Sequence, residues 1–250
     1  MIQKKTLKAY KNPEFINSRK ARTIRILSEY LEPEKIFEEM NVQHTIVFFG
    51  SARTKSKDKN NSKDTSYWVA EELAFKLAAW SKEIEMLNKG FYICTGGGPG
   101  IMEAANRGAS RAKASTMGLN ISLPFEQFSN RYITPDLNLE FHYFFMRKLW
   151  FLYHAKAVIV FPGGFGTLDE LFETLTLIQT KKIKKGNIPI LLYDKTYWEK
   201  LINFQMLVDL NMISPEDLDL LSFFSNPDEG FNYLKPRIEK LINEVNINLE

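Results

Sequence analysis

The stretch from Ala157 to Glu170 reads AVIVFPGGFGTLDE. It begins with five apolar residues that show no polar alternation, which is typical of a strand buried on both faces. A glycine-rich turn follows at 163–166, and then a sequence with helical character. A buried strand, a turn and a helix in this order form the unit from which parallel sheets are built.

The same unit recurs along the chain. Further apolar runs without alternation predict buried strands at 45–49, 91–94, 117–123 and 188–193. Amphipathic segments predict helices at 66–88, 99–114, 144–154, 167–185, 198–210 and 232–248. Alternating strands and helices predict an α/β fold, a Rossmann-like doubly wound parallel sheet flanked by helices with right-handed crossovers.

An N-terminal helical segment precedes this pattern. We divide the chain into a helical extension at 1–43 and a nucleotide-binding catalytic domain at 44–250. The apolar residues of the extension are spaced to give one helix face, and Pro33 is expected to break it into two helices. The set comprises Ile16, Ile24, Ile26, Leu27, Tyr30 and Leu31.

Composition excludes several classes of protein. The 33 basic and 30 acidic side chains give a formal charge of +3, too small an excess for a nucleic-acid-binding protein. The longest apolar stretch carries charges and is shorter than a membrane span. No apolar segment follows the first lysines, and Cys94 has no second cysteine to pair with. We therefore expect a cytoplasmic protein with no nucleic-acid or membrane partner.

Two glycine-rich loops are expected at the carboxyl edge of the sheet, where doubly wound folds bind ligands. The first reads TGGGPGIME from Thr95 to Glu103, and the second is the turn at 163–166. Backbone N–H groups at a helix start attract anions, so a nucleotide phosphate suits both loops. No Gly-Lys-Ser/Thr follows either loop, and Ile101 replaces the third glycine of the dinucleotide fingerprint, which disfavours a P-loop and NAD.

Two side chains near these loops allow alternative interpretations. Thr167 and Glu170 have capping-box spacing, and on spacing alone a helix cap is favoured over a catalytic carboxylate. Arg147 lies in an aromatic helix, where an arginine that binds an anion in the cleft and one that extends to water are equally consistent with the sequence. His44, His142 and His154 show no metal-ligand spacing, so no metal is expected.

Three segments together resemble the LOG family of nucleoside 5′-monophosphate phosphoribohydrolases, once labelled lysine decarboxylases. They are GGGPGIME at 96–103, MRK at 146–148 and PGGFGTLDE at 162–170. The resemblance implies a homodimer that hydrolyses the N-glycosidic bond of AMP or an N6-modified AMP to free base and ribose 5-phosphate, without a cofactor. It implies catalytic roles for Arg147 and Glu170, and substrate or phosphate binding by Ser51, Gly97, Gly98, Lys148, Gly163, Gly164, Gly166 and Thr167.

The chain departs from the small plant-type members of that family. It has Gly-Ile-Met-Glu where they have Gly-Leu-Met-Gly, and it adds the extension and a lysine-rich loop at 55–64. Plain AMP or another purine monophosphate is therefore as good a candidate as a cytokinin-type substrate. A nucleotide-binding or sensing protein without turnover remains an alternative, as does a carrier with an inherited cleft. A lysine decarboxylase would need pyridoxal phosphate on a lysine, and no residue argues for that chemistry.

Overall fold

A computed structural model describes residues 6–55, 65–85, 89–124, 128–182 and 188–247. Within these ranges the strands form one sheet in the order β4-β3-β2-β1-β5-β6-β7, and every pairing is parallel. The predicted Rossmann-like fold is confirmed. The strands are β1 (Thr45–Phe49), β2 (Tyr92–Thr95), β3 (Thr116–Ile121), β4 (Asn138–Phe141), β5 (Ala155–Val160), β6 (Ile190–Tyr193) and β7 (Leu221–Phe224).

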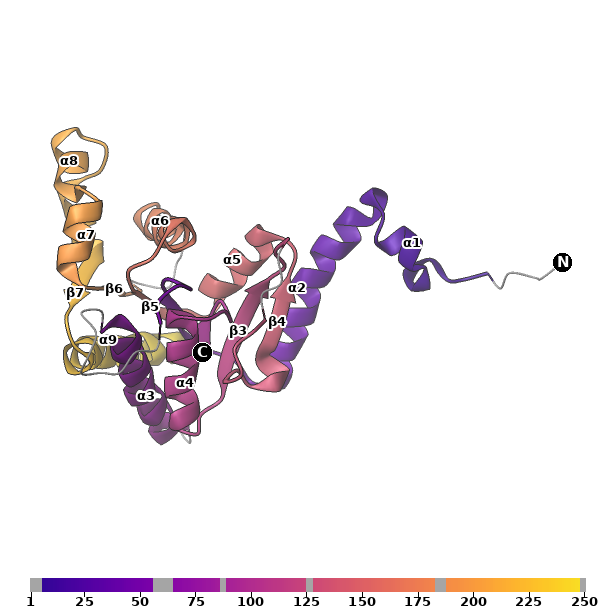
Figure 1. Cartoon of the computed structure of the whole chain (residues 1–250), viewed down its shortest axis with the longest axis horizontal. Helices are drawn as coiled ribbons and strands as arrows, with labels where there is room; N and C mark the ends of the chain where they lie inside the picture. The colour runs from indigo at the N-terminus through magenta and orange to yellow at the C-terminus, as the bar shows by residue number, and fades with distance from the viewer. Residues whose placement is uncertain (1–5, 56–64, 86–88, 125–127, 183–187, 248–250) are drawn as a thin grey trace.

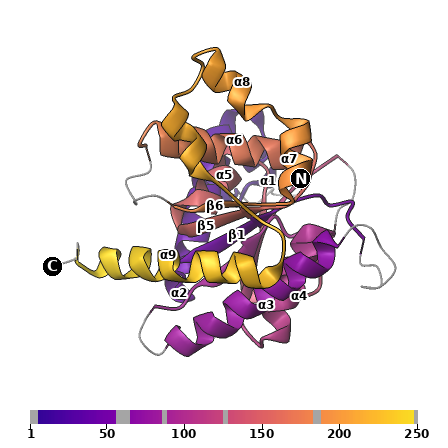
Figure 2. The same cartoon turned by 90° about the vertical axis from the view of Figure 1, so that its left-hand side faces the viewer.

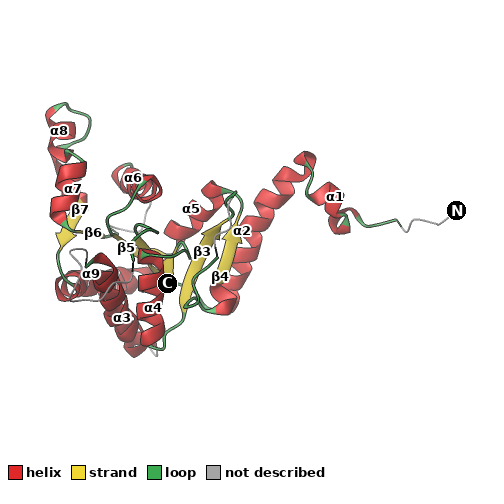
Figure 3. Ribbon diagram, in the orientation of Figure 1, coloured by secondary structure: helices red, strands yellow, loops and turns green. Residues whose placement is uncertain are grey.

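Helices cover both faces of the sheet (Figures 1, 2 and 3). One face carries α3 (Ser66–Glu85), α4 (Ile101–Arg111) and α9 (Pro227–Ile247). The other carries α2 (Arg22–Glu39), α5 (Phe144–Tyr153), α6 (Phe165–Gln179) and α7 (Lys195–Leu201). The short elements are η1 (Ala9–Lys11), α1 (Pro13–Ile16), η2 (Arg19–Ala21), η3 (Pro135–Leu137), α8 (Phe204–Asp209) and η4 (Pro215–Leu220).

The central strand β1 shows why the strand sequences are continuously apolar. Ile46 and Phe48 point into the core beneath α3 and α4, whereas Val47 and Phe49 point into the core beneath α2 and α5. All five β1 residues are buried. Because both faces of this strand are covered, polar alternation is absent. The strand order reverses at β1, so the loops after β1, β2 and β5 meet at one edge.

The two edge strands were not predicted. In β4, Asn138 and Glu140 are exposed and alternate with less exposed Leu139 and Phe141. In β7 most residues are only half-buried. Because these strands are not buried on both faces, they lack the long apolar runs by which the inner strands were recognised.

The expectation that Pro33 breaks the extension into two helices is wrong. Helix α2 runs from Arg22 to Glu39 with Pro33 inside it and buried. Proline removes the backbone donor that would reach the carbonyl of Glu29, four residues earlier. The indole Nε1 of Trp150 donates to that carbonyl at 3.1 Å instead. A side chain of α5 therefore supplies the hydrogen bond that the proline removes.

Glu29 also makes a second contact with α5. Its carboxylate accepts hydrogen bonds from the backbone N–H groups of His142 at 2.8 Å and Tyr143 at 3.1 Å, immediately before the helix begins. A carboxylate at a helix start satisfies unpaired donors and interacts favourably with the helix dipole. The extension thus caps the helix that carries Arg147.

The apolar residues of α2 do not form the single face that was predicted. Ile26, Tyr30 and Phe37 pack toward the sheet. Ile24, Leu27 and Leu31 lie on a different face of the helix and are exposed. The sequence segment is therefore apolar on two faces, of which one is covered by this chain.

The helix predicted at 198–210 is also wrong, because it is divided into α7 and α8. Ile202 adopts an extended backbone, and the side chain of Asn203 accepts the N–H of Met206 at 3.0 Å to start a new helix. Asparagine side chains that bond the backbone compete with helix continuation in this way.

Several sequence predictions lie partly outside the described residues. These are the lysine-rich loop beyond residue 55 and the ends of the predicted helices at 86–88, 183–185 and 248. In the part of the chain that is described, no helix combines the length and apolarity that a bilayer crossing requires.

Replacement of Glu29 by alanine should lower the free energy of unfolding by about 1 kcal/mol, because the start of α5 loses its cap. Urea unfolding monitored by circular dichroism measures this. Glu32→Ala provides a matched control, since Glu32 is an exposed glutamate on the same helix. Its effect should stay within about 0.5 kcal/mol. Equal losses for both variants would contradict the capping role.

Candidate functional site

The site lies at the carboxyl edge of the sheet, where the backbone of Ser51 joins the two glycine loops. The N–H of Ser51 donates to the carbonyl of Pro162 at 3.1 Å, and the carbonyl of Ser51 accepts the N–H of Ile101 at 3.1 Å. Gly100 has a φ of +71°, and a β-carbon there would lie 2.3 Å from the Ser51 carbonyl oxygen. Glycine is therefore required at this close approach.

The first glycine loop is held from behind by Asn130. The Asn130 side-chain amide donates to the carbonyls of Gly97 at 3.0 Å and Gly98 at 3.2 Å. It also donates to the Oδ1 of Asn106 at 2.9 Å, which is fully buried and hydrogen-bonded in turn to Thr95. Gly97 and Gly98 are buried and do not border the cavity described below. Of this loop, Gly96 reaches the cavity.

The second glycine loop opens directly into the start of α6. Gly164 is the residue before the helix, and α6 begins at Phe165 rather than at Thr167 as predicted. The first N–H groups of a helix have no partner within it, and Phe165 and Gly166, the first two residues of α6, border the cavity. The Tyr197 hydroxyl donates to the carbonyl of Gly163 at 2.8 Å and fixes the loop.

The start of α6 also excludes the capping-box interpretation of Glu170. Thr167 lies inside the helix and not at its cap position, so Glu170 cannot be the third helical residue of a capping box. Instead Glu170 is buried and faces α5, with 8% of its side chain exposed. The sequence spacing was misleading because the glycines before Thr167 are already part of the helix start.

Arg147 and Glu170 come together although they are far apart in the sequence. The Arg147 Nη2 atom lies 3.8 Å from Glu170 Oε1, and 13% of the arginine side chain is exposed. The rings of Phe144 and Phe151 lie 5.3 Å and 5.4 Å from the guanidinium carbon. The Arg147 Nε atom is buried and has no protein hydrogen-bond partner. Arg147 also borders the cavity described below.

Lys148 lies beside the pair but is directed away from the cavity. Its Nζ atom lies 2.8 Å from Asp169, 2.5 Å from Glu173 and 3.9 Å from Glu170. Burial alone would lower the pKa of Lys148, but the hydrogen bonds to Asp169 and Glu173 outweigh it and raise the pKa. Lys148 does not border the cavity and joins α5 to α6.

Burial dominates the electrostatics of the pair. Removal from water raises the pKa of Glu170 from 4.5 to about 7, although Lys148 and Arg147 act in the opposite direction. The nearest nitrogen atoms of the two cations lie 3.8 Å and 3.9 Å from the Glu170 carboxylate, which are long distances for ion pairs. Lys148 also pairs with two other carboxylates. Burial likewise lowers the pKa of Arg147. Glu170 is thus poised to gain or lose a proton near neutral pH.

A cavity of about 700 Å³ connects these groups. Its size suits a nucleotide-sized ligand. Sequence reasoning placed Ser51, Arg147, Gly163, Gly164, Gly166, Thr167 and Glu170 in the site, and all of these border the cavity. The sequence analysis missed the apolar wall, which includes Met102, Ile121, Leu123, Phe144, Phe165 and Leu201.

The missed residues gave no distinct sequence signal. Phe144 is one aromatic residue among many in its segment, and Leu201 comes from a different part of the chain. Phe165 stands inside the glycine motif, and its side chain is 92% exposed at the mouth of the cavity. The position of this aromatic residue between two glycines was the one sequence feature that pointed to the apolar wall.

Comparison with known proteins identifies the family to which the chain belongs. A family model described as "Possible lysine decarboxylase" matches residues 102–234, more than half of the chain. The chain belongs to this family. The match includes Arg147, the second glycine loop and Glu170, and it confirms the resemblance to LOG proteins. No curated protein matches the sequence closely enough to count as a relative.

Solved structures of low identity share the fold of this LOG-family chain. A molybdenum cofactor binding protein from Rippkaea orientalis is 19% identical, with a TM-score of 0.53 over 80% of this chain and 99% of its own. The protein TM1055 is 21% identical, with a TM-score of 0.52 over 77% and 99%. The Moco carrier protein of Chlamydomonas reinhardtii is 17% identical, with a TM-score of 0.50 over 79% and 99%.

Glu170→Gln should stabilise the protein more at pH 8 than at pH 5. Because the folded pKa of about 7 exceeds 4.5, folded protein retains a proton that unfolded protein releases between these values. Wild-type stability therefore falls as pH rises through this window, by at most about 3 kcal/mol. Glutamine carries no charge, so the variant does not lose this stability as the pH rises. Thermal unfolding of both proteins at the two pH values measures it, and a pH-independent difference in Tm contradicts it.

Proposed function

We propose that this LOG-family protein is a nucleoside 5′-monophosphate phosphoribohydrolase. It cleaves the N-glycosidic bond of AMP or an N6-modified AMP and releases free base and ribose 5-phosphate. The observation that carries the proposal is the buried pair of Arg147 and Glu170 in one cavity with the exposed start of α6. An anion site, a carboxylate and a guanidinium are the groups that this reaction requires.

The phosphate is assigned to the second glycine loop. Gly164 and Gly166 are exposed, and a β-carbon at either position would meet no atom within 4 Å, so a ligand can approach the backbone there. The N–H groups and dipole at the start of α6 favour an anion. The Thr167 side chain borders the same cavity and adds a hydroxyl group. Phosphate binding at this point fixes the position of the sugar.

Glu170 is assigned to the reacting carbon. As the C1′–N9 bond breaks, positive charge develops on the ribosyl ring, and a carboxylate beside it lowers the energy of that state. The same carboxylate polarises a water molecule whose oxygen bonds to C1′. A pKa of about 7 suits the exchange of a proton with this water at neutral pH.

Arg147 is assigned to the leaving group or the phosphate. The departing purine accumulates negative charge until it is protonated, and the guanidinium of Arg147, which borders the cavity, can stabilise that charge. The apolar wall, including Met102 and Phe144, suits the flat purine ring. The N6 position distinguishes AMP from modified AMP, and the assay described below ranks them.

The reaction named in the family description fits the site less well. A lysine that forms a Schiff base must have a neutral amine. Lys148 is surrounded by carboxylates that raise its pKa. The residues described as bordering the cavity include no lysine. Lysine decarboxylation is therefore not proposed.

A second candidate is a protein that binds a nucleotide-like ligand without turnover. The observation in its favour is that two proteins of similar fold are a molybdenum cofactor binding protein and a Moco carrier protein. Such a protein would use the same glycine loop for the ligand phosphate. It would not need Glu170 in its charged form.

The decisive assay incubates purified protein with AMP, GMP, CMP, UMP and isopentenyl-AMP and measures free base and ribose 5-phosphate by chromatography. We expect release from the purine monophosphates, and Glu170→Gln should reduce kcat by at least about 100-fold. Glu32→Gln is the control, because it removes an exposed carboxylate of α2 that does not border the cavity. Saturable binding without any product would favour the second candidate.

The pH dependence provides an independent test of the role of Glu170. If the carboxylate form is the active one, kcat/KM should fall about tenfold for each pH unit below the pKa of about 7 and level off above it. Stopped assays between pH 5 and pH 9 measure this dependence. A rate that rises as pH falls below 7 would mean that Glu170 acts in its protonated form.

A further inference from the structure

Arg53 is a third charged residue of the cavity. It lies in the loop after β1, is exposed and borders the cavity. Among the described residues that border the cavity, the charged side chains are those of Arg53, Arg147 and Glu170. Arg147 lies within ion-pair distance of Glu170. None of the ion pairs in the described part of the chain involves Arg53, so no described carboxylate balances its charge.

The backbone of Arg53 is tied to the second glycine loop. The N–H of Arg53 donates to Ser51 Oγ at 3.1 Å, which is the hydrogen bond of a tight turn. The N–H of Ser51 donates to the carbonyl of Pro162 at 3.1 Å, and Pro162 directly precedes the glycine-rich turn at 163–166. Two hydrogen bonds therefore connect Arg53 to the loop that leads into α6.

The register of the sheet brings Arg53 and the start of α6 to the same edge. β1 and β5 are parallel neighbours, and Phe49 pairs with Val160 at their ends. Arg53 follows Phe49 by four residues, and Gly164 follows Val160 by four residues. Neighbouring strands lie about 4.8 Å apart, a separation that the long side chain of an arginine spans. Arg53 and Gly164 accordingly border the same cavity.

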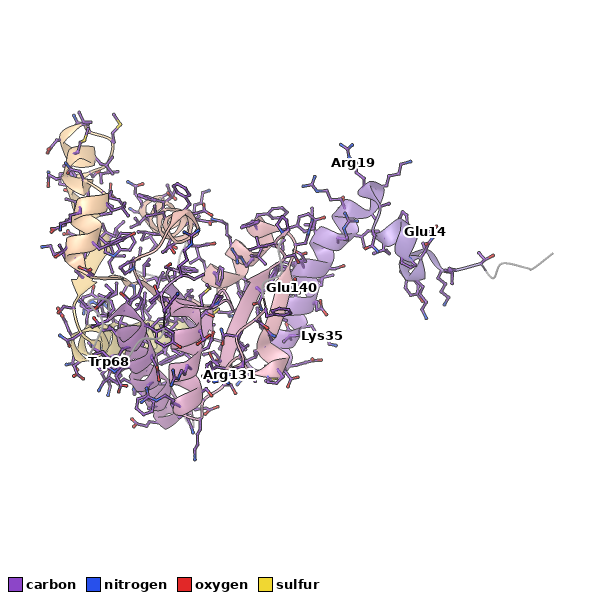
Figure 4. The ribbon with its side chains drawn as sticks, viewed as in Figure 1. Glu14, Arg19, Lys35, Trp68, Arg131 and Glu140 are labelled. Carbon is purple, nitrogen blue, oxygen red and sulfur yellow. The ribbon has the colours of Figure 1, made fainter. Side chains whose placement is uncertain are left out.

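Other basic residues are less suited to bind a ligand in the cavity. The resemblance to LOG proteins implied such a role for Lys148, but Lys148 pairs with carboxylates of α6 and does not border the cavity. Figure 4 shows Arg19 at the projecting end of the extension, with its side chain directed away from the body. Of the described basic residues, Arg53 alone borders the cavity without an acidic partner.

We propose that the guanidinium of Arg53 binds the ligand phosphate and makes the site selective for phosphomonoesters. The proposal rests on the assignment of the phosphate to the second glycine loop in the proposed function. A phosphomonoester carries between about 1.5 and 2 negative charges at pH 7. The dipole at the start of a helix supplies only about half of a positive charge. Arg53 adds a full charge on a planar group whose donors match the phosphate oxygens.

This role predicts a particular kinetic effect. The reaction breaks the bond at C1′ and leaves the phosphate unchanged, so Arg53 contacts the phosphate equally in the ground state and in the transition state. An interaction of this kind lowers KM without raising kcat. Arg53 is therefore a binding residue that selects phosphorylated ligands, whereas Glu170 acts on the reacting carbon. Nucleosides lack the group that Arg53 binds and should be poor ligands.

Binding of ribose 5-phosphate tests the role of Arg53 without turnover. Isothermal titration calorimetry of the full chain measures the dissociation constant. Arg53→Ala should raise it at least about tenfold, because a charge-assisted hydrogen bond to phosphate is lost. Arg53→Lys should raise it less, since lysine keeps the charge but not the planar group.

Lys55→Ala is the matched control. Lys55 is an exposed residue of the same loop and does not border the cavity, and its replacement removes the same single positive charge. Because salt screens exposed charges that are more than about 8 Å apart at physiological ionic strength, the control should bind ribose 5-phosphate within about twofold of wild type. Equal affinities of Arg53→Ala and Lys55→Ala would overturn the proposal, as would a wild-type protein that binds neither ribose 5-phosphate nor AMP.

Steady-state kinetics with AMP separates this proposal from the proposed function. Arg53→Ala should raise KM at least about tenfold and change kcat less than about threefold. A loss of kcat with unchanged KM would place Arg53 at the reacting carbon and overturn its assignment to the phosphate. Binding of ribose 5-phosphate that depends on Arg53, without release of base from any monophosphate, would support the role of Arg53 and refute the hydrolase.

Discussion

Two hydrogen bonds of the Ser51 backbone hold the site together. One reaches the loop after β5 and the other reaches the start of α4 after β2. Each joins a loop to Ser51, two residues after the end of β1, so the two loops are linked through one residue. The contact requires glycine at position 100, because any side chain there would collide with the Ser51 carbonyl. The position of the cavity between two glycine loops follows from this constraint.

Burial of the charged groups of the site opposes folding. Glu170 is buried among apolar groups and weakly paired cations, an environment that opposes its charge. Folding must therefore compensate for a group that would be more stable in water. The positive charge of Lys148 lies between the carboxylates of Asp169 and Glu173 and therefore reduces the repulsion between these two groups. Lys148 does not border the cavity, yet it contributes to the electrostatic environment of Glu170.

The sequence predicted the inner part of the fold well because burial on both faces leaves a clear mark. Strands β1 and β5 are buried along their whole length and contain the apolar runs 46–49 and 157–160, and the helix carrying Arg147 was placed correctly. The edge strands β4 and β7 were missed because half-buried strands lack that mark. Pro33 was misjudged because the group that satisfies the Glu29 carbonyl is Trp150, which is more than a hundred residues away.

In the site, too, local sequence motifs were predicted, whereas contacts between residues distant in the sequence were not. The glycine motif located the second loop, yet the spacing from Thr167 to Glu170 favoured a cap that does not exist. The distance from Arg147 to Glu170 depends on how α5 and α6 pack, and no local pattern encodes it. Asn130 escaped notice because its role, holding the carbonyls of Gly97 and Gly98, involves its position in space and not a motif.

Glu29 gives the extension a connection to the helix that carries Arg147. Its carbonyl accepts Trp150 and its carboxylate accepts the amides of His142 and Tyr143. These three hydrogen bonds couple the ordering of α2 to that of the start of α5. The backbone amides of His142 and Tyr143 become natural reporters of the extension in hydrogen exchange, since their protection depends on a residue more than a hundred positions earlier in the chain.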